Sequence, residues 1–164
     1  MDRAGFQAWL DRYVEAWRTY DPETIASLFT EDARYSYHPY DEDVVGKDAI
    51  VKDWLQDPDT AGSWEARYEP WALEGDRGVA IGRSRYLEGF GQQPTEYANV
   101  YLVTFAEDGR AREFREYFME AREGFRKRRQ EEIAEAVEQA RSEWQQQSER
   151  ATLAGELAET KVQG

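Results

Sequence analysis

The fold is decided by the stretch Glu96-Tyr-Ala-Asn-Val-Tyr-Leu-Val-Thr-Phe105, by the turn Glu107-Asp-Gly109, and by Ala111-Arg-Glu-Phe-Arg-Glu-Tyr-Phe-Met119. Both long segments are rich in the β-branched and aromatic residues that favour strands, and a short turn with glycine is typical of an antiparallel hairpin. Segments 63–73 and 79–87 have the same character and are separated by the turn residues 74–78. The region from 63 to 119 is therefore predicted to form a meander of strands.

Alternation in the segment 96–105 divides its side chains between two faces. One face carries Tyr97, Asn99, Tyr101, Val103 and Phe105, and the other carries Ala98, Val100 and Leu102. Both faces are largely apolar, which indicates that both are covered.

The region before the strands has helical periodicity. Apolar residues at intervals of three and four define one face over residues 5–18: Phe6, Trp9, Leu10, Tyr13, Val14 and Trp17. Asp21 followed by Pro22 predicts the start of a second helix, which should run to about Phe29 and end at 30–32. After a short strand at 34–37, a third helix should follow Gly46 and bury Ile50, Val51, Trp54 and Leu55.

Helices followed by a meander of strands predict an α+β domain, with three N-terminal helices on one face of a curved antiparallel sheet. Residues 122–164 differ, because polar helix formers dominate there. In that segment Ile133, Val137, Ala140 and Trp144 lie at spacings of four, three and four. We expect a domain over 1–121 and a helical extension over 122–164, which packs on the domain, packs on a neighbouring subunit, or is a free tail.

The composition restricts the partners. The chain has 164 residues, no cysteine and a formal net charge of −13, so nucleic acid and anionic membranes are disfavoured as partners. The absence of cysteine excludes disulfides and thiolate chemistry. Neither a signal peptide nor an apolar run of roughly 18 residues is visible, and we expect a cytoplasmic protein without a cofactor.

The sole histidine, His38, precedes Pro39 and the acidic run 41–43. An imidazole titrates close to neutral pH and is suited to proton transfer, although a lone histidine is also a common surface or packing residue. With the acidic run it offers one nitrogen and several oxygens, but no second histidine. A metal site is therefore not expected, and the acidic run is interpreted as a solvated turn.

Glu116 is singled out by periodicity. Alternation places it on one face with Phe114 and Phe118, which suggests the wall of a pocket. A carboxylate held there needs a partner or a proton, and His38 or a tyrosine is the partner that we expect. The opposite register would expose Glu116 instead.

Five segments in this order resemble the nuclear transport factor 2-like superfamily, in its SnoaL-like and ketosteroid-isomerase-like branch. They are Asp11-Arg-Tyr-Val-Glu-Ala-Trp17, Asp21-Pro-Glu-Thr-Ile-Ala-Ser-Leu-Phe-Thr-Glu-Asp-Ala33, Gly46-Lys-Asp-Ala-Ile50, Val103-Thr-Phe-Ala-Glu-Asp-Gly-Arg110 and Glu113-Phe-Arg-Glu-Tyr-Phe118. The resemblance covers residues 5–121 and implies a cone-shaped fold with a deep pocket, often paired as a homodimer through the other face of the sheet. The superfamily includes isomerases, cyclases, dehydratases, epoxide hydrolases and non-catalytic binders, so the fold alone selects no reaction.

The resemblance also implies roles for individual positions. Tyr13 stands where ketosteroid isomerases carry the tyrosine that donates to the developing oxyanion, although a core tyrosine is the equal alternative. His38, or Tyr37 if the alignment shifts by one residue, stands where those enzymes carry the general base before a proline. Tyr101 replaces their buried acid, which leaves a steroid isomerase unsupported.

The sequence therefore predicts a pocket for a small, partly apolar molecule. The alternatives are an acid/base enzyme that acts next to a carbonyl, with His38, Tyr13, Glu116 and Tyr101 in the reaction, and an interaction module that uses the C-terminal helix. Further residues expected to line the pocket are Trp17, Tyr35, Tyr37, Trp54, Tyr86, Tyr97, Asn99, Phe114 and Phe118.

Overall fold

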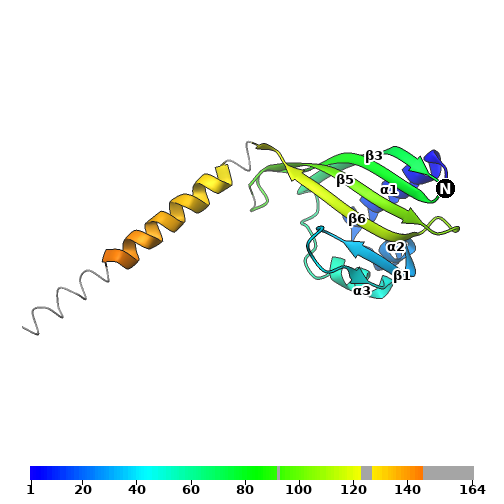
Figure 1. The fold of residues 1–164 in the computed structure, drawn as a ribbon, viewed down its shortest axis with the longest axis horizontal. Coiled ribbons are helices and arrows are strands. Elements are labelled where there is room, and N and C mark those ends of the chain that lie inside the picture. Colours follow the sequence, from blue (N-terminus) through cyan, green and yellow to red (C-terminus); the bar gives the residue numbers. More distant parts are fainter. Residues whose placement is uncertain (92, 123–126, 146–164) are drawn as a thin grey trace, which may run out of the picture. The chain divides into compact units, whose positions relative to one another are not determined.

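The structure is a computed structural model that describes residues 1–91, 93–122 and 127–145 (Figure 1). Its named elements are α1 (Arg3–Thr19), α2 (Pro22–Ser27), β1 (Phe29–Ser36), β2 (Val44–Val45), α3 (Lys47–Trp54), β3 (Trp64–Glu74), β4 (Arg77–Tyr86), β5 (Thr95–Phe105) and β6 (Ala111–Glu120). The strands form one sheet in the order β2-β1-β6-β5-β4-β3. The α+β class, with helices packed against a curved sheet, is therefore confirmed.

One strand pairing departs from the expected antiparallel pattern. The strands β3, β4, β5 and β6 follow each other as antiparallel neighbours, as the hairpin turns predict. However, β1 lies parallel to β6, with Tyr35 opposite Phe114. Because β1 pairs with β6, the segment around residue 35 lies beside the last strand of the domain.

Aspartate side chains cap the first two helices: α2 begins at Pro22 as predicted, whereas α1 begins at Arg3, two residues before the expected range. The Asp2 carboxylate caps α1 by accepting a hydrogen bond from the Gly5 amide at 2.7 Å. Asp21 caps α2 in the same way through the Thr24 amide at 2.7 Å, and Pro22 occupies the first turn.

The predicted end of the second helix was wrong. We expected the helix to reach Phe29 and to be followed by loop residues, whereas α2 ends at Ser27 and β1 begins at Phe29. The cause is tertiary pairing: Phe29 lies opposite Ala111 of β6, and the Ala111 amide donates to the Leu28 carbonyl at 2.8 Å. Backbone hydrogen bonds to a distant strand outweigh the weak local helix preference.

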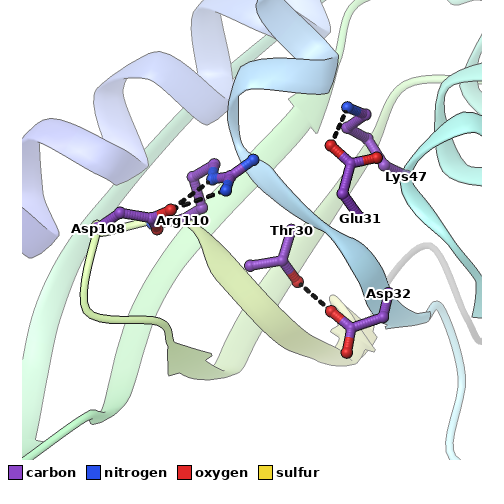
Figure 2. A network of polar contacts seen from close by, with 6 residues as sticks. All are labelled: Thr30, Glu31, Asp32, Lys47, Asp108 and Arg110. Atoms are coloured by element: carbon purple, nitrogen blue, oxygen red, sulfur yellow. Dashed lines mark hydrogen bonds and ion pairs between the residues drawn. The ribbon is translucent and has the colours of Figure 1, made fainter.

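One ion pair joins the first part of β1 to α3, and a second lies within the turn between β5 and β6, as Figure 2 shows. Lys47, the first residue of α3, pairs with Glu31 at 2.5 Å. Asp108 and Arg110 pair at 2.8 Å within the turn between β5 and β6. These pairs are on the surface, and such pairs each contribute about 0–1 kcal/mol. They refine the local arrangement rather than hold the fold together.

The core lies between the helices and one face of the sheet, here called the inner face. Trp9 of α1 is fully buried and contacts Phe105 and Phe114 at ring distances of 5.6 and 6.1 Å. Its indole nitrogen donates to the Leu28 carbonyl at 3.2 Å. The apolar stripe of α1 therefore covers the inner face of β5 and β6.

The chain divides into two compact units, Met1–Ala121 and Arg122–Gly164. Within the second unit, residues 127–145 form a helix on which Ile133, Val137 and Trp144 are exposed (Figure 1). The rest of the predicted extension, 146–164, lies outside the described residues. Among the helices that the structure describes, none is both long and apolar enough to span a membrane.

Candidate functional site

The candidate site is a cluster of tyrosines around one carboxyl group on the inner face. Tyr13 of α1 and Tyr35 of β1 are both buried, and their hydroxyl oxygens are 2.6 Å apart. The Phe114 ring stacks on both, at centroid distances of 5.2 and 4.6 Å. Tyr101 of β5 completes the wall, with its ring 4.8 Å from that of Phe114. Residues from a helix and three strands thus meet at one point.

Glu116 lies on β6 directly opposite Tyr101 of β5. Its neighbours Arg115 and Tyr117 are exposed, so Glu116 is on the inner face with Phe114, which is the register favoured by the alternation. Glu116 is partly buried, and its Oε1 accepts a hydrogen bond from Asn99 Nδ2 at 2.7 Å. The expected partner was His38 or a tyrosine, and the structure provides Asn99 instead.

Burial changes the acidity of this carboxyl group. Desolvation raises the pKa of Glu116 from 4.5 to about 7, against the lowering effect of the Asn99 hydrogen bond. The charged form is penalised because little solvent reaches the carboxylate. Glu116 can therefore exchange a proton near neutral pH, which is the property required of a general acid or base.

The surrounding tyrosines are hydrogen-bond donors at neutral pH. Burial raises the pKa values of Tyr13, Tyr35 and Tyr101 well above 10.0, and the nearby Glu116 charge raises them further. In the Tyr13–Tyr35 pair, one hydroxyl donates to the other and the second hydroxyl keeps a proton for a further acceptor. The pair can therefore pack in the core and also donate a hydrogen bond to a ligand. The geometry is compatible with Tyr13 as a core residue and with Tyr13 as a donor to an oxyanion.

Tyr68 of β3 is a site residue that the sequence reasoning missed. It is buried, its ring lies 4.4 Å from that of Tyr101, and it faces Gly82 of β4. An added Cβ at Gly82 would lie 2.2 Å from the Tyr68 ring, so glycine is required for this approach. The Tyr68 hydroxyl has the Ser84 and Tyr101 side chains nearby, but it makes no hydrogen bond of good geometry. The alternation of β3 and the position of Gly82 were the signals for it.

His38 lies at the edge of this cluster, in the turn after β1. The imidazole is half-buried, with its ring 6.1 Å from that of Phe118 and 5.4 Å from that of Tyr40. The Tyr97 ring meets the Phe118 ring edge-on, with the ring centres 5.6 Å apart. No hydrogen bond joins the described side chains of His38 and Glu116. His38, Tyr97 and Phe118 form what we call the aromatic rim.

Trp17 and Tyr86, both predicted to line the pocket, direct their polar atoms at Asp59 instead. The Asp59 carboxylate accepts from Trp17 Nε1 at 2.8 Å, from the Tyr20 hydroxyl at 3.2 Å and from the Tyr86 hydroxyl at 3.4 Å. In return the Asp59 amide donates to the Tyr20 hydroxyl at 2.9 Å. These bonds fasten the loop between α3 and β3 to the end of α1.

Replacing Asp59 with alanine is expected to lower the free energy of unfolding by about 1.5–3 kcal/mol, because three donors lose a shared charged acceptor. Urea denaturation monitored by tryptophan fluorescence measures the change. The control is Asp57→Ala, in the same loop and exposed, which should stay within about 0.5 kcal/mol of the unmodified protein. Equal losses in the two variants would refute the anchoring role of Asp59.

Two further predicted residues lie near α3. Tyr37 is partly exposed and donates to Asp53 of α3 at 2.6 Å, which occupies its hydroxyl. Trp54 is buried, and its ring meets Tyr13 edge-on at 5.2 Å. The Trp54 indole nitrogen has no hydrogen-bond partner. Trp54 is thus part of the inner cluster, whereas Tyr37 ties β1 to α3.

Other candidate sites in the described part of the chain offer less chemistry. No group of three or more His, Asp or Glu side chains there is arranged to hold a metal ion. A groove of about 660 Å³ between α2 and α3 is lined by Pro22, Glu23, Ala26, Asp48, Val51, Lys52, Leu55 and Gln56. None of these residues belongs to the cluster around Glu116.

Comparison with known proteins identifies the family of the chain and agrees with its fold. The family model described as a SnoaL-like domain matches residues 10–114. No match is found among curated protein sequences. Solved structures that resemble this one align with about 70% of the chain. Their sequence identity is under 20%, so the similarity shows a shared fold and nothing more.

Three of these solved structures illustrate the fold. A ketosteroid isomerase-like protein from Erwinia carotovora atroseptica SCRI1043 superposes on this chain with a TM-score of 0.56 and 16% sequence identity. The alignment covers 71% of this chain and 95% of the other. A putative ketosteroid isomerase from Kribbella flavida DSM 17836 has a TM-score of 0.55 and 19% identity, over 73% and 82%. An NTF-2 like protein of unknown function from Burkholderia xenovorans LB400 has a TM-score of 0.54 and 16% identity, over 70% and 83%.

Proposed function

The chain belongs to the SnoaL-like domain family, and on that premise we propose that it binds a small, partly apolar molecule against the inner face of its sheet. The observation that carries this proposal is Glu116, a partly buried carboxyl group with a pKa of about 7 among tyrosine hydroxyls. A side chain with such a perturbed pKa on a largely apolar face is a common mark of a functional site.

The inner face offers donors and apolar surface together. The Tyr68 hydroxyl and the Trp54 indole nitrogen are buried without a hydrogen bond of good geometry, and a buried unpaired donor costs about 1–3 kcal/mol. A ligand oxygen that accepts from Tyr68 would remove that cost. The rings of Tyr101 and Phe114 would contact the apolar part of the ligand. His38, in the aromatic rim, would contact its outer end.

A second function, proton transfer next to a carbonyl, is favoured by the acidity of Glu116. In this reaction the Glu116 carboxylate takes a proton from the carbon adjacent to a ketone. The electrons of the broken C–H bond form a C=C bond, and the carbonyl oxygen becomes an enolate that accepts a hydrogen bond from Tyr68 or from the Tyr13–Tyr35 pair. The protonated Glu116 exchanges its proton with solvent, and return of a solvent-derived proton from Glu116 to carbon re-forms the C–H bond and the ketone. Glu116 is the base in this proposal, in place of His38.

Both functions are tested with 2-tetralone, a bicyclic ketone with exchangeable protons beside the carbonyl. Binding is measured by NMR shift changes in the protein, which should include Tyr101 and Phe114. Catalysis is measured by deuterium uptake into the ketone in D₂O, which should rise with pH through about 7 as Glu116 ionises. Glu116→Gln is expected to reduce the catalysed exchange by about 10²–10⁴-fold.

Glu113→Gln is the matched control, because Glu113 is an exposed carboxyl group on the other face of the same strand. It should leave binding and exchange unchanged. Binding without exchange would support the first function and reject the second. Shift changes confined to the groove between α2 and α3, or no shift changes at all, would contradict both.

Two expectations about partners also remain proposals. Leu102, Tyr117 and Met119 are exposed on the outer face of β5 and β6, which supports a homodimer formed through that face. Ile133 and Trp144 are exposed on the C-terminal helix, which supports a role for that helix in recruiting a partner.

A further inference from the structure

We infer that Ser84 and Asn99 form a two-residue relay that orients the Glu116 carboxyl group and favours its charged form. This inference rests on the proposed function of Glu116 and adds two positioning residues to it. The three side chains come from three neighbouring strands, β4, β5 and β6, and all lie on the inner face. Ser84 and Asn99 are both buried, so neither is held in place by solvent.

The hydrogen bonds run in one direction across the sheet. Ser84 Oγ donates to Asn99 Oδ1 at 3.3 Å, and Asn99 Nδ2 donates to Glu116 Oε1 at 2.7 Å. A carboxylate can only accept, so the amide must present its NH₂ group to Glu116. Its oxygen then faces Ser84, whose hydroxyl is the donor that this oxygen needs. The two bonds therefore select a single orientation of the Asn99 amide.

The hydrogen bond from Asn99, which Ser84 orients, is the polar interaction that stabilises the negative charge on Glu116. Among the described residues, the tyrosines whose pKa the Glu116 charge raises are Tyr13 from α1, Tyr35 from β1, Tyr37 from the turn after it, Tyr68 from β3 and Tyr101 from β5. None of these groups carries a positive charge. The Asn99 hydrogen bond is accordingly the interaction that lowers the pKa of Glu116, while burial raises it.

The test is a titration of the Glu116 carboxyl carbon by ¹³C NMR in the full chain and in two variants. Asn99→Leu removes the donor at similar volume and is expected to move the midpoint upward by about one pH unit. Ser84→Ala leaves Asn99 in place and should move the midpoint upward by less. The pH at which deuterium exchange into 2-tetralone begins should move in the same direction in each variant. A residue that only supports the fold would not shift these midpoints.

Thr104→Val is the matched control, because Thr104 on β5 donates to the Glu113 carboxylate at 3.2 Å on the other face. It should leave the Glu116 midpoint in place. A midpoint near 7 in the unmodified protein that neither variant moves would overturn the relay alone. A midpoint near 4.5 in the unmodified protein would overturn the proposed function as well. If Asn99→Leu does not fold, the direction of the Ser84→Ala shift decides.

Discussion

Replacing Phe114 with alanine is expected to lower the free energy of unfolding by about 3–5 kcal/mol. The ring is 2% exposed and stacks on Tyr13 and Tyr35, with Tyr101 beside it. Its removal leaves a cavity between α1 and the sheet, and it also removes aromatic contacts that contribute about 0.5–1.5 kcal/mol per pair. Urea denaturation measures the change.

The control is Phe118→Ala, on the same strand and the same face. Phe118 is 48% exposed, so its replacement should cost about 1 kcal/mol or less. A loss below about 1.5 kcal/mol for Phe114→Ala would show that the inner cluster does not hold α1 to the sheet.

Replacing Glu116 with glutamine changes the free energy of unfolding by an amount that depends on pH. We expect this change to be more favourable at pH 8 than at pH 4.5 by roughly 3 kcal/mol. The pKa of Glu116 is raised from 4.5 to about 7 in the folded state, so the folded protein binds the proton more tightly than the unfolded chain does. The stability contributed by this group is therefore complete below about pH 4.5 and is lost as the pH rises through about 7. Glutamine keeps the acceptor for Asn99 and has no charge to bury.

The measurement is urea denaturation of the two proteins at several pH values between 4.5 and 8. The difference between them isolates Glu116, because all other groups titrate in both. Glu113→Gln, on the exposed face, should show no such trend with pH. A stability difference between the Glu116→Gln variant and the unmodified protein that stays constant across this range would contradict the buried position of the carboxyl group.

The fold was predictable to a large extent because its signals are local. The spacing of apolar residues in α1, the cap at Asp21 and the alternation in β5 each depend on residues a few positions apart. The beginning of β1 and the two-residue β2 were missed. Both depend on pairing: β1 lies parallel to β6, which is some 80 residues later in the chain, and β2 is held by β1. Local patterns carry no information about such partners.

The faces of the strands were predictable from alternation, but the hydrogen bonds between strands were not. Periodicity placed Glu116, Asn99 and Tyr101 on the inner face, where the structure has them. The Glu116–Asn99 bond depends on the register of β5 against β6, which shifts at an irregularity between Thr104 and Phe105. That irregularity is not visible in the sequence. The roles of His38, Tyr13 and Tyr101 stay predictions.

We propose that Glu116 is a neutral-pH acid on a face of the sheet that receives a ligand. The most direct test of this claim is the ¹³C titration of the Glu116 carboxyl carbon in the unmodified protein, with and without saturating 2-tetralone. We predict a midpoint near 7 without the ketone, and a change in the Glu116 signal when the ketone binds. A midpoint near 4.5 that the ketone does not affect would contradict the claim.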